Sequence, residues 1–346
     1  MTKIFEKQGK LVIEDAEIPD NAEITVFRGE QPTLTVANKE LVGTFTGNTL
    51  EFAKSAADEE FRQYYVYQYA EITKIVALRN LSLAGTFNTR DLGGYQTKTG
   101  QTVKWGQVFR SDALYQLTDQ DVKDLERMNL RTVVDFRGEN EIADAPDREI
   151  AGVNYVYLNP NAEVAALATG NLVDDQEKVS KLVAIANSPE GPAYFASRLD
   201  EMALQMRELV STEIANKQYR RFLELLLEED STPLLEHCKG GKDRAGFAAI
   251  VFLMALGVSK EVILQDYLLT KENMQQRNVK RMDEYRVYTD HPDVLNYLSG
   301  LMDTKALYFE AAFDEMEKLG GADKFLTKVL GISEEQIMAL QQKFLY

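Results

Sequence analysis

The hydrophobic pattern of the chain changes near residue 75. Before that point, short β-branched and aromatic runs are separated by Gly, Asn, Asp and Pro, a spacing typical of strands joined by turns. The runs are KLVIEDA, AEITVFRG, TLTVANK, LVGTFTG, TLEFA and QYYVYQY. We therefore expect residues 1–75 to form a small antiparallel β unit. Two roles suit such a unit: a structural appendage that covers an edge of the remaining chain, or a docking surface for a substrate or partner.

From about residue 80, strand-like runs alternate with helical segments. Thr118 is expected to cap a helix over 119–129, because Asp121 completes a capping box three residues later. The β-branched run at 131–136 then predicts a strand. Strands alternating with helices are typical of α/β folds with a largely parallel sheet.

The second half of the chain continues this alternation. Residues 195–229 have a strongly helical pattern and precede a strand predicted at 233–236. Residues 245–256 are apolar on every face, which indicates a buried central helix. Ser333 and Gln336 repeat the capping-box signature before a last helix. Residues 76–346 are therefore predicted to form one α/β domain, with a central, mostly parallel sheet flanked by helices.

Candidate chemistry lies between that strand and that central helix, in the segment LEHCKGGKDRAGF at 235–247. It contains Cys238, the single cysteine of the chain, and Arg244 six residues later. A thiolate followed by a loop of backbone N–H groups and a guanidinium is what a phosphate-binding nucleophile loop needs. The N-terminus of the following helix favours both a thiolate and a bound anion. The spacing thus predicts a cysteine-dependent phosphatase.

A lone cysteine is more often a small buried hydrophobe, so its neighbours decide between the two interpretations. Gly240, Gly241 and Gly246 would let the backbone approach a ligand closely. The cations of this segment are His237, Lys239, Lys242 and Arg244. A nucleotide-binding P-loop is disfavoured, because Asp243 stands where that motif needs Ser or Thr.

The string HCKGGKDRAG resembles the signature loop of bacterial tyrosine phosphatases, H-C-x-x-G-K-D-R-[ST]-G, a family related to dual-specificity and phosphoinositide phosphatases. Further segments resemble other elements of that family, in the family's order: GTFNTRDLGGY at 85–95, KWGQVFRSD at 104–112, TVVDFRGE at 132–139, LQDYLLT at 264–270 and GISEEQIMALQQKFL within 320–345. The resemblance spans roughly residues 80–346 and implies the cysteine-phosphatase fold.

The expected mechanism begins with attack of Cys238 on phosphorus to give a cysteinyl-phosphate, while Arg244 clamps two nonbridging oxygens. His237 is expected to orient the loop from behind. The phosphate-binding groups are expected to come from Lys239, Gly240, Gly241, Lys242, Asp243 and Arg244.

The leaving group also needs a proton, and two aspartates are candidates for the general acid. Asp243 lies in the loop, and Asp135 ends a predicted strand at the same sheet edge. Arg137 would then be a second anion clamp, or else the partner of Asp135 in a structural ion pair. Arg90 and Asp91 are expected to brace the loop rather than take part in chemistry.

Ala245 departs from the family pattern, which has Ser or Thr after the arginine. A hydroxyl there is expected to donate a hydrogen bond to the sulfur, and losing such a bond costs about 1.5–3 kcal/mol. We therefore expect slow hydrolysis of the cysteinyl-phosphate. The alternative function is a phosphate-binding module with impaired catalysis. A redox enzyme would need an external thiol, because the chain has no second cysteine.

The expected substrates are phosphoproteins, first of all phosphotyrosine, with phosphoserine, phosphothreonine and phosphoinositides as further candidates. The two loop lysines, Lys239 and Lys242, resemble the loop of 3-phosphoinositide phosphatases, where paired cations meet additional phosphates. The long region 159–215 could form a helical lid over the thiolate.

Composition restricts partners and location. Lys and Arg number 39 against 55 Asp and Glu, a net charge of −16, which argues against nucleic acid as a partner. One cysteine and two histidines make a dedicated metal site improbable, and no cofactor is implied. There is no signal-like or membrane-spanning apolar run, so the expected location is cytoplasmic, although partner-dependent export would leave no trace. The sequence makes no prediction of oligomeric state.

Overall fold

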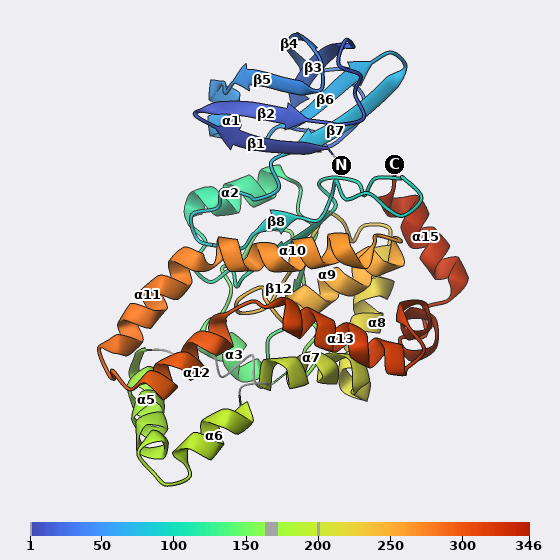
Figure 1. Cartoon of the computed structure of the whole chain (residues 1–346). Coiled ribbons are helices and arrows are strands. Elements are labelled where there is room, and N and C mark those ends of the chain that lie inside the picture. The colour runs from blue at the N-terminus through green and yellow to red at the C-terminus, as the bar shows by residue number, and fades with distance from the viewer. Residues whose placement is uncertain (1, 163–171, 199–200) are drawn as a thin grey trace.

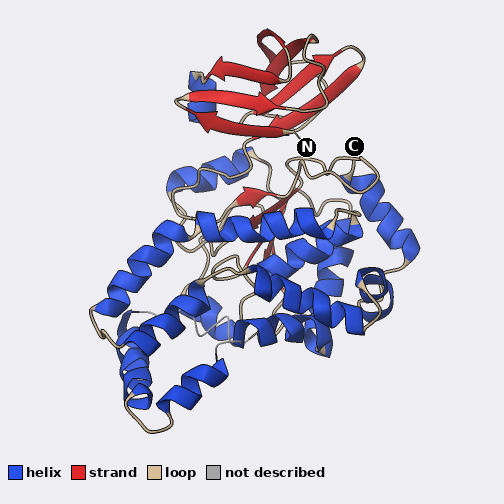
Figure 2. Ribbon diagram, viewed as in Figure 1, coloured by secondary structure: helices blue, strands red, loops and turns tan. Residues whose placement is uncertain are grey.

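The computed structural model describes residues 2–162, 172–198 and 201–346 (Figure 1). A small β unit lies at one end of a larger α/β domain, and both chain termini lie near the junction of the two (Figure 1). Strands make up most of the β unit, whereas helices surround the sheet of the larger domain (Figure 2).

The β unit consists of two antiparallel sheets. The first has the order β1 (Lys3–Lys7), β2 (Lys10–Glu14), β5 (Thr49–Ala53), and the second the order β4 (Glu40–Thr46), β3 (Glu23–Gly29), β6 (Tyr64–Tyr69), β7 (Ile72–Ala77). A short helix, α1 (Ala56–Glu60), precedes β6. Alternate residues of facing strands, such as Leu11, Val26 and Leu50, are fully buried in one apolar cluster. The period-two pattern of the sequence therefore produces a two-layer sandwich.

Trp105 joins the two parts of the molecule. It belongs to the α/β domain in sequence, yet it is buried in the apolar cluster of the β unit. Its indole N–H donates to the carbonyl of Ile75 at 3.2 Å. The β unit is therefore packed directly onto the α/β domain.

The larger domain is built around a five-stranded sheet with the order β11 (Asn154–Tyr157), β10 (Thr132–Asp135), β12 (Leu234–His237), β9 (Val108–Ser111), β8 (Arg90–Asp91). All neighbouring pairs are parallel except β8 with β9. The predicted mostly parallel sheet is confirmed. The carboxyl ends of β10, β12 and β9 meet at one edge, where open α/β sheets bind ligands.

The two faces of this sheet enter different apolar clusters. Val108, Val134 and Leu234 pack into the large cluster that contains α7, α8 and α9, whereas Phe109 and Leu235 pack toward α2. The described helices of the domain are α2 (Asp119–Arg127), α3 (Glu139–Asp144), α5 (Leu172–Ala186), α6 (Gly191–Arg198), α7 (Glu201–Ser211), α8 (Glu213–Leu227), α9 (Arg244–Ala255), α10 (Lys260–Asn273), α11 (Gln275–Arg286), α12 (Pro292–Met302), α13 (Ala306–Lys318), α14 (Ala322–Lys324), a π-helical turn at Phe325–Val329 and α15 (Glu334–Phe344).

The expected helix starts are confirmed at two positions. Thr118 and Asp121 form a reciprocal capping box at α2, and Ser333 and Gln336 form one at α15. The long helical stretch expected before β12 is instead divided, because α7 and α8 are separated at Thr212. No helix in the described ranges is long and apolar enough to cross a membrane.

Helices α5, α6, α11 and α12 form an arm at one side of the domain (Figure 1). Helices α5 and α6 share a separate apolar cluster with α11 and α12, in which Val179, Phe195, Tyr285 and Leu298 are buried. The segment proposed from sequence as a lid, 159–215, includes α5, α6 and α7, and its residues 163–171 and 199–200 lie outside the described residues.

Candidate active site

Cys238 follows the last residue of β12 and lies at the carboxyl edge of the sheet, between the ends of β10 and β9. Only 2% of its surface is exposed. Residues 239–243 form a loop, and α9 begins at Arg244, so the helix N-terminus adds positive potential beside the sulfur. The predicted strand, loop and helix therefore occur in the expected order.

The carbonyl groups of this loop are bound from outside. The backbone N–H of Ala113 donates to Lys239 O at 3.2 Å. The Asn88 side-chain amide donates to Gly240 O at 3.3 Å and to Gly241 O at 3.0 Å. These donors come from the segments around β8 and β9, which pass beneath the loop.

Arg110, on β9, binds the next part of the loop. Its Nε donates to Gly241 O at 2.9 Å and its Nη2 to Lys242 O at 3.0 Å. The loop peptides are trans, so each N–H points away from the carbonyl of the preceding residue. The N–H groups of residues 240–243 therefore face away from this support, and they donate to no acceptor among the described residues. Successive backbone N–H groups without an acceptor can form an anion-binding concavity.

Two glycines lie directly against this support. A side chain at Gly241, whose φ is +62°, would place Cβ 2.4 Å from Ser111 O. A Cβ at Gly246 would lie 2.8 Å from Arg110 Nη2. Gly241 needs glycine because the scaffold approaches from behind, which is a different reason from the ligand approach expected from sequence, whereas at Gly246 the Arg110 guanidinium would have to move. Gly240 has no neighbour closer than 4.0 Å to its added Cβ.

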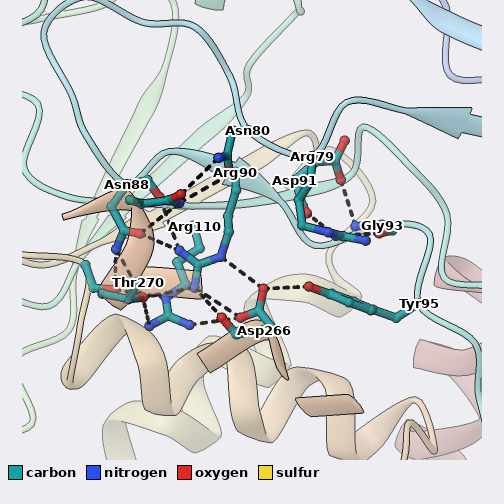
Figure 3. A network of polar contacts seen from close by, with 12 residues as sticks. Arg79, Asn80, Asn88, Arg90, Asp91, Gly93, Tyr95, Arg110, Asp266 and Thr270 are labelled. Atoms are coloured by element: carbon teal, nitrogen blue, oxygen red, sulfur yellow. Dashed lines mark hydrogen bonds and ion pairs between the residues drawn. The ribbon is translucent and has the colours of Figure 1, made fainter. Parts of the chain in front are cut away.

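A buried polar network holds Arg110 in place (Figure 3). Asp266, on α10, binds Arg110 Nη1 at 3.0 Å and Arg90 Nε at 3.0 Å. Arg90 also donates to Asn88 Oδ1 at 2.6 Å, which turns the Asn88 amide N–H groups toward the loop. Burial alone would raise the pKa of Asp266, but the charges of the two arginines outweigh it and lower that pKa well below its usual range.

On the other side of the loop, Arg244 is paired with Glu141 of α3. Its Nη1 donates to Glu141 Oε2 at 2.5 Å and its Nη2 to Oε1 at 2.8 Å, and Nη1 is also 3.4 Å from Phe136 O. The Nε–H and the second Nη2–H lie on one edge of the guanidinium and remain for a ligand. Arg244 Nε is buried without a partner in the described part of the chain.

Arg244 reaches the wall of a cavity of about 860 Å³. The cavity is lined by α3 and by Tyr157, Asn159, Gln218 and Arg244. Room for a ligand is therefore available on the side of the loop where Glu141 lies.

Asp243 precedes α9 and is buried. Its Oδ1 has no hydrogen-bond partner in the ranges that the structure describes, and its Oδ2 lies 3.6 Å from Lys242 Nζ. Burial raises the pKa of Asp243 and outweighs the neighbouring cations, Lys242 first among them. A carboxyl group that retains its proton and has an unused oxygen can serve as a proton donor.

His237 lies beneath Cys238. Its Nδ1 is 3.2 Å from Cys238 O, and its Nε2 is 3.0 Å from Asp147 Oδ2. Burial would lower the pKa of His237, but the carboxylates of Asp135 and Asp147 reverse this and raise it. The raised pKa favours the imidazolium form, which can donate to both neighbours and carries a positive charge.

Asp135 is held by Arg137. The guanidinium binds both carboxylate oxygens at 2.8–3.0 Å, and the same Arg137 binds Asp147 at 2.9 Å. Asp135, Asp147 and His237 could by their spacing hold a metal ion, but Arg137 already balances both carboxylates. The geometry is that of a buried ion-pair cluster, one of the two arrangements left open for Asp135 and Arg137 by the sequence.

The two loop lysines differ in position. Lys242 Nζ donates to Leu301 O at 2.6 Å and to Asp303 O at 3.0 Å, so its ammonium closes the end of α12. Burial lowers the pKa of Lys239, with Glu141 opposing this effect. The Lys239 ammonium has no hydrogen bond or ion pair among the residues described, although the Lys239 carbonyl accepts from Ala113.

Asp91 supports the junction between the two parts of the molecule. It binds Arg62 of the β unit at 3.0 Å and accepts from the N–H groups of Gly93 at 2.8 Å and Gly106 at 2.9 Å. Its chain neighbour Arg90 is the residue that contacts the network beneath the loop.

Ala245 is fully buried in the first turn of α9 and carries no hydroxyl. The nearby Tyr219 hydroxyl, on α8, donates to Arg244 O at 3.1 Å. The carbonyl of Arg244, the residue before Ala245, is therefore also bound from outside the loop.

Asn88, Arg110 and Glu141 contact the loop or Arg244, and Asp266 holds Arg110; the sequence did not identify these residues as site residues. Arg110 and Asp266 each interrupt an otherwise apolar segment, VFRS and LQDYLL, and a buried charge needs a partner. That pattern was the available signal for both. It does not identify which charges pair.

Comparisons with known proteins place the chain among tyrosine phosphatases. A family model described as the tyrosine phosphatase family matches residues 81–346. The triple specificity protein phosphatase PtpB of Mycobacterium tuberculosis is 25% identical over 269 residues, covering 74% of this chain and 95% of the relative. A Cupriavidus necator protein, named provisionally as a tyrosine-protein phosphatase, is 25% identical over 251 residues, covering 72% of this chain and 84% of the relative. The crystal structure of TpbA from P. aeruginosa is similar at 17% identity and a TM-score of 0.24, over 61% of this chain and 90% of that one.

Proposed function

Because the chain belongs to the tyrosine phosphatase family and is a phosphoric monoester hydrolase, we propose that it hydrolyses phosphotyrosine through a cysteinyl-phosphate on Cys238. The observation that carries this proposal is the arrangement of the loop around Cys238. Its carbonyls are bound from outside, its N–H groups face the opposite side, and Arg244 keeps one guanidinium edge open. Phosphoryl transfer depends chiefly on such positioning and electrostatic stabilisation.

In the first step, the Cys238 thiolate attacks phosphorus and the bond from phosphorus to the tyrosine oxygen breaks. Asp243 gives its proton to the departing phenolate. In the second step, water attacks phosphorus, the sulfur–phosphorus bond breaks, and the Asp243 carboxylate takes a proton from the water. The products are tyrosine, inorganic phosphate and the original thiolate.

We assign the acid role to Asp243 rather than Asp135. Asp243 has an unused carboxyl oxygen and a raised pKa, whereas both oxygens of Asp135 are bound by Arg137. Because the pKa of Asp243 is raised, its proton is present below that pKa and is lost as pH rises through it. The rate of the first step should accordingly fall on the alkaline side of that pKa.

The remaining site residues have supporting roles in this proposal. Gly240, Gly241, Lys242 and Asp243 supply backbone N–H groups to the phosphate. His237 supplies charge from below and Arg137 holds the carboxylates beside it. Lys239 is the one loop lysine whose ammonium is free for a second anion in the part of the chain described.

The first test is turnover of p-nitrophenyl phosphate and of a phosphotyrosine peptide by the wild type and by Cys238→Ser. We expect complete loss in the variant, and a phosphorylated protein in acid-quenched wild-type reactions. Turnover that survives the substitution would falsify the assignment of the nucleophile.

The second test separates the two aspartates by leaving group. Asp243→Asn should slow phenyl phosphate far more than p-nitrophenyl phosphate, because the better leaving group needs less protonation. Asp135→Asn should slow both equally and lower the melting temperature, because it weakens the pair with Arg137. A reversed pattern would move the acid role to Asp135.

A phosphate-binding module with impaired catalysis is the alternative function, and Ala245 is the observation that favours it. Phosphoinositides are further candidate substrates, favoured by the free ammonium of Lys239, and phosphoserine and phosphothreonine are others. Turnover of phosphotyrosine, phosphoserine and phosphoinositides, measured side by side with phosphate binding, distinguishes these possibilities.

A further inference from the structure

We propose that Arg110 is a positioning residue for phosphate binding, which aims the N–H groups of Lys242 and Asp243 by binding the two preceding carbonyls from behind the loop. This inference rests on the proposed function and adds a residue that does not touch the substrate.

The first support is the geometry of the two bonds. Arg110 Nε and Nη2 bind Gly241 O and Lys242 O at 2.9 and 3.0 Å. Each trans peptide is planar, so fixing a carbonyl also fixes the direction of the N–H that follows it. One rigid guanidinium thus orients two successive peptide groups together.

The second support is that the other donors of the Arg110 guanidinium are bound to fixed partners. Its Nη1 is bound to Asp266, and its Nη2 also donates to Thr270 Oγ1 at 3.2 Å. Arg110 is fully buried, so no competing water reaches it. Gly246 leaves just enough room, since an added Cβ would lie 2.8 Å from Nη2.

The third support is the charge balance beneath the loop. Arg90 and Arg110 face a single ionised partner, Asp266. Glu236, the next acidic group, has both oxygens unpartnered among the described residues. Burial raises the pKa of Glu236 well above its usual range, which favours its neutral form. A net positive charge therefore lies behind the loop, where it favours a bound anion.

The test compares Arg110→Lys with Tyr95→Phe in the full-length protein. This substitution keeps the positive charge but removes the planar guanidinium that donates to both loop carbonyls. Tyr95 donates to Asp266 at 2.8 Å and touches no loop carbonyl, so it is the matched control for a weakened network. The readouts are the inhibition constant of inorganic phosphate, kcat and KM for p-nitrophenyl phosphate, and the melting temperature.

For Arg110→Lys we expect phosphate inhibition to weaken about tenfold, with kcat falling by a similar factor. Tyr95→Phe should change the phosphate constant less than about twofold, although its melting temperature also falls. A purely structural role for Arg110 would lower the melting temperature of both variants and leave phosphate binding unchanged in both, which overturns the inference.

If Arg110→Lys does not fold, a second variant can test the same inference. Gly246→Ala favours the helix by its propensity but pushes the Arg110 guanidinium aside. We expect weaker phosphate inhibition from a folded protein, and unchanged inhibition would again contradict the inference. If Cys238→Ser were to remain active, the proposed function would fail, whereas an inactive Cys238→Ser with normal phosphate binding in Gly246→Ala would reject the inference alone.

Discussion

Arg244 and Arg110 lie on opposite sides of the same loop, and each is paired with a carboxylate. Arg244 gives one edge of its guanidinium to Glu141 and keeps the other edge open. Arg110 uses its donors on Asp266, Thr270 and two loop carbonyls. The same chemical group therefore serves recognition where donors are left open, and support where they are all engaged.

The difference follows from what surrounds each side chain. Arg244 lines the cavity on the Glu141 side, and its Nε has no partner in the described part of the chain. Arg110 lies within packed side chains between β9, the loop and α10, where an unused donor would carry a desolvation cost. Both side chains are almost completely buried, so the donors that their neighbours leave unused, and not burial, distinguish the two arginines.

The largest effect on catalysis is expected from a substitution of Arg244. Arg244→Lys removes two charge-assisted hydrogen bonds to phosphate, together worth about 3–6 kcal/mol, so kcat/KM should fall on the order of 10²–10⁴-fold. Steady-state kinetics on a phosphotyrosine peptide measures this. A loss no larger than that of Arg110→Lys would mean that the two sides are equivalent.

The next largest effect is expected at Ala245, where the front of the loop lacks a donor. Ala245→Ser should restore a hydrogen bond to the sulfur and speed hydrolysis of the cysteinyl-phosphate about ten- to a hundredfold. Rapid-quench measurements should show a stoichiometric burst in the wild type and its disappearance in the variant. Unchanged steady-state turnover would show that the missing hydroxyl does not limit the enzyme.

A smaller effect is expected at Glu141, which holds the closed edge of Arg244. Glu141→Gln keeps the shape but removes the charge, so Arg244 should be less well oriented and kcat/KM should fall about tenfold. The inhibition constant of inorganic phosphate shows independently whether Glu141 strengthens or weakens anion binding. Tighter phosphate binding in the variant would indicate that Glu141 competes with the substrate instead of orienting its partner.

The smallest effect is expected at Glu236, where a substitution tests the charge balance behind the loop. Glu236→Gln should change the phosphate inhibition constant less than about twofold at neutral pH, because burial already keeps this carboxyl protonated. If Glu236 were ionised, the amide would remove a negative charge and strengthen phosphate binding severalfold. Titration of the inhibition constant in both proteins measures the difference.

The sequence predicted the elements that depend on local pattern. The capping boxes at Thr118 and Ser333, the strand before Cys238 and the apolar helix after it all agree with the structure. Side-chain to backbone contacts within one turn specify such features, so they can be read without the rest of the fold.

The pairing of distant charges could not be predicted in the same way. Arg110 and Asp266 are 156 positions apart in the chain, and Arg244 and Glu141 are 103 positions apart. Several acidic residues were available to each arginine. Only the packing of α10 against β9, and of α3 beside α9, selects the partner.

The sequence by itself determined that Cys238 would follow a strand and precede a helix, with Arg244 six residues away, because strand, loop and helix are contiguous in the chain. The tertiary structure alone decided which way the loop peptides face. Their orientation depends on donors from Asn88, Arg110 and Ala113, which the sheet brings beneath the loop from distant segments. A peptide plane can turn either way in a flexible chain, and the carbonyl partners fix it.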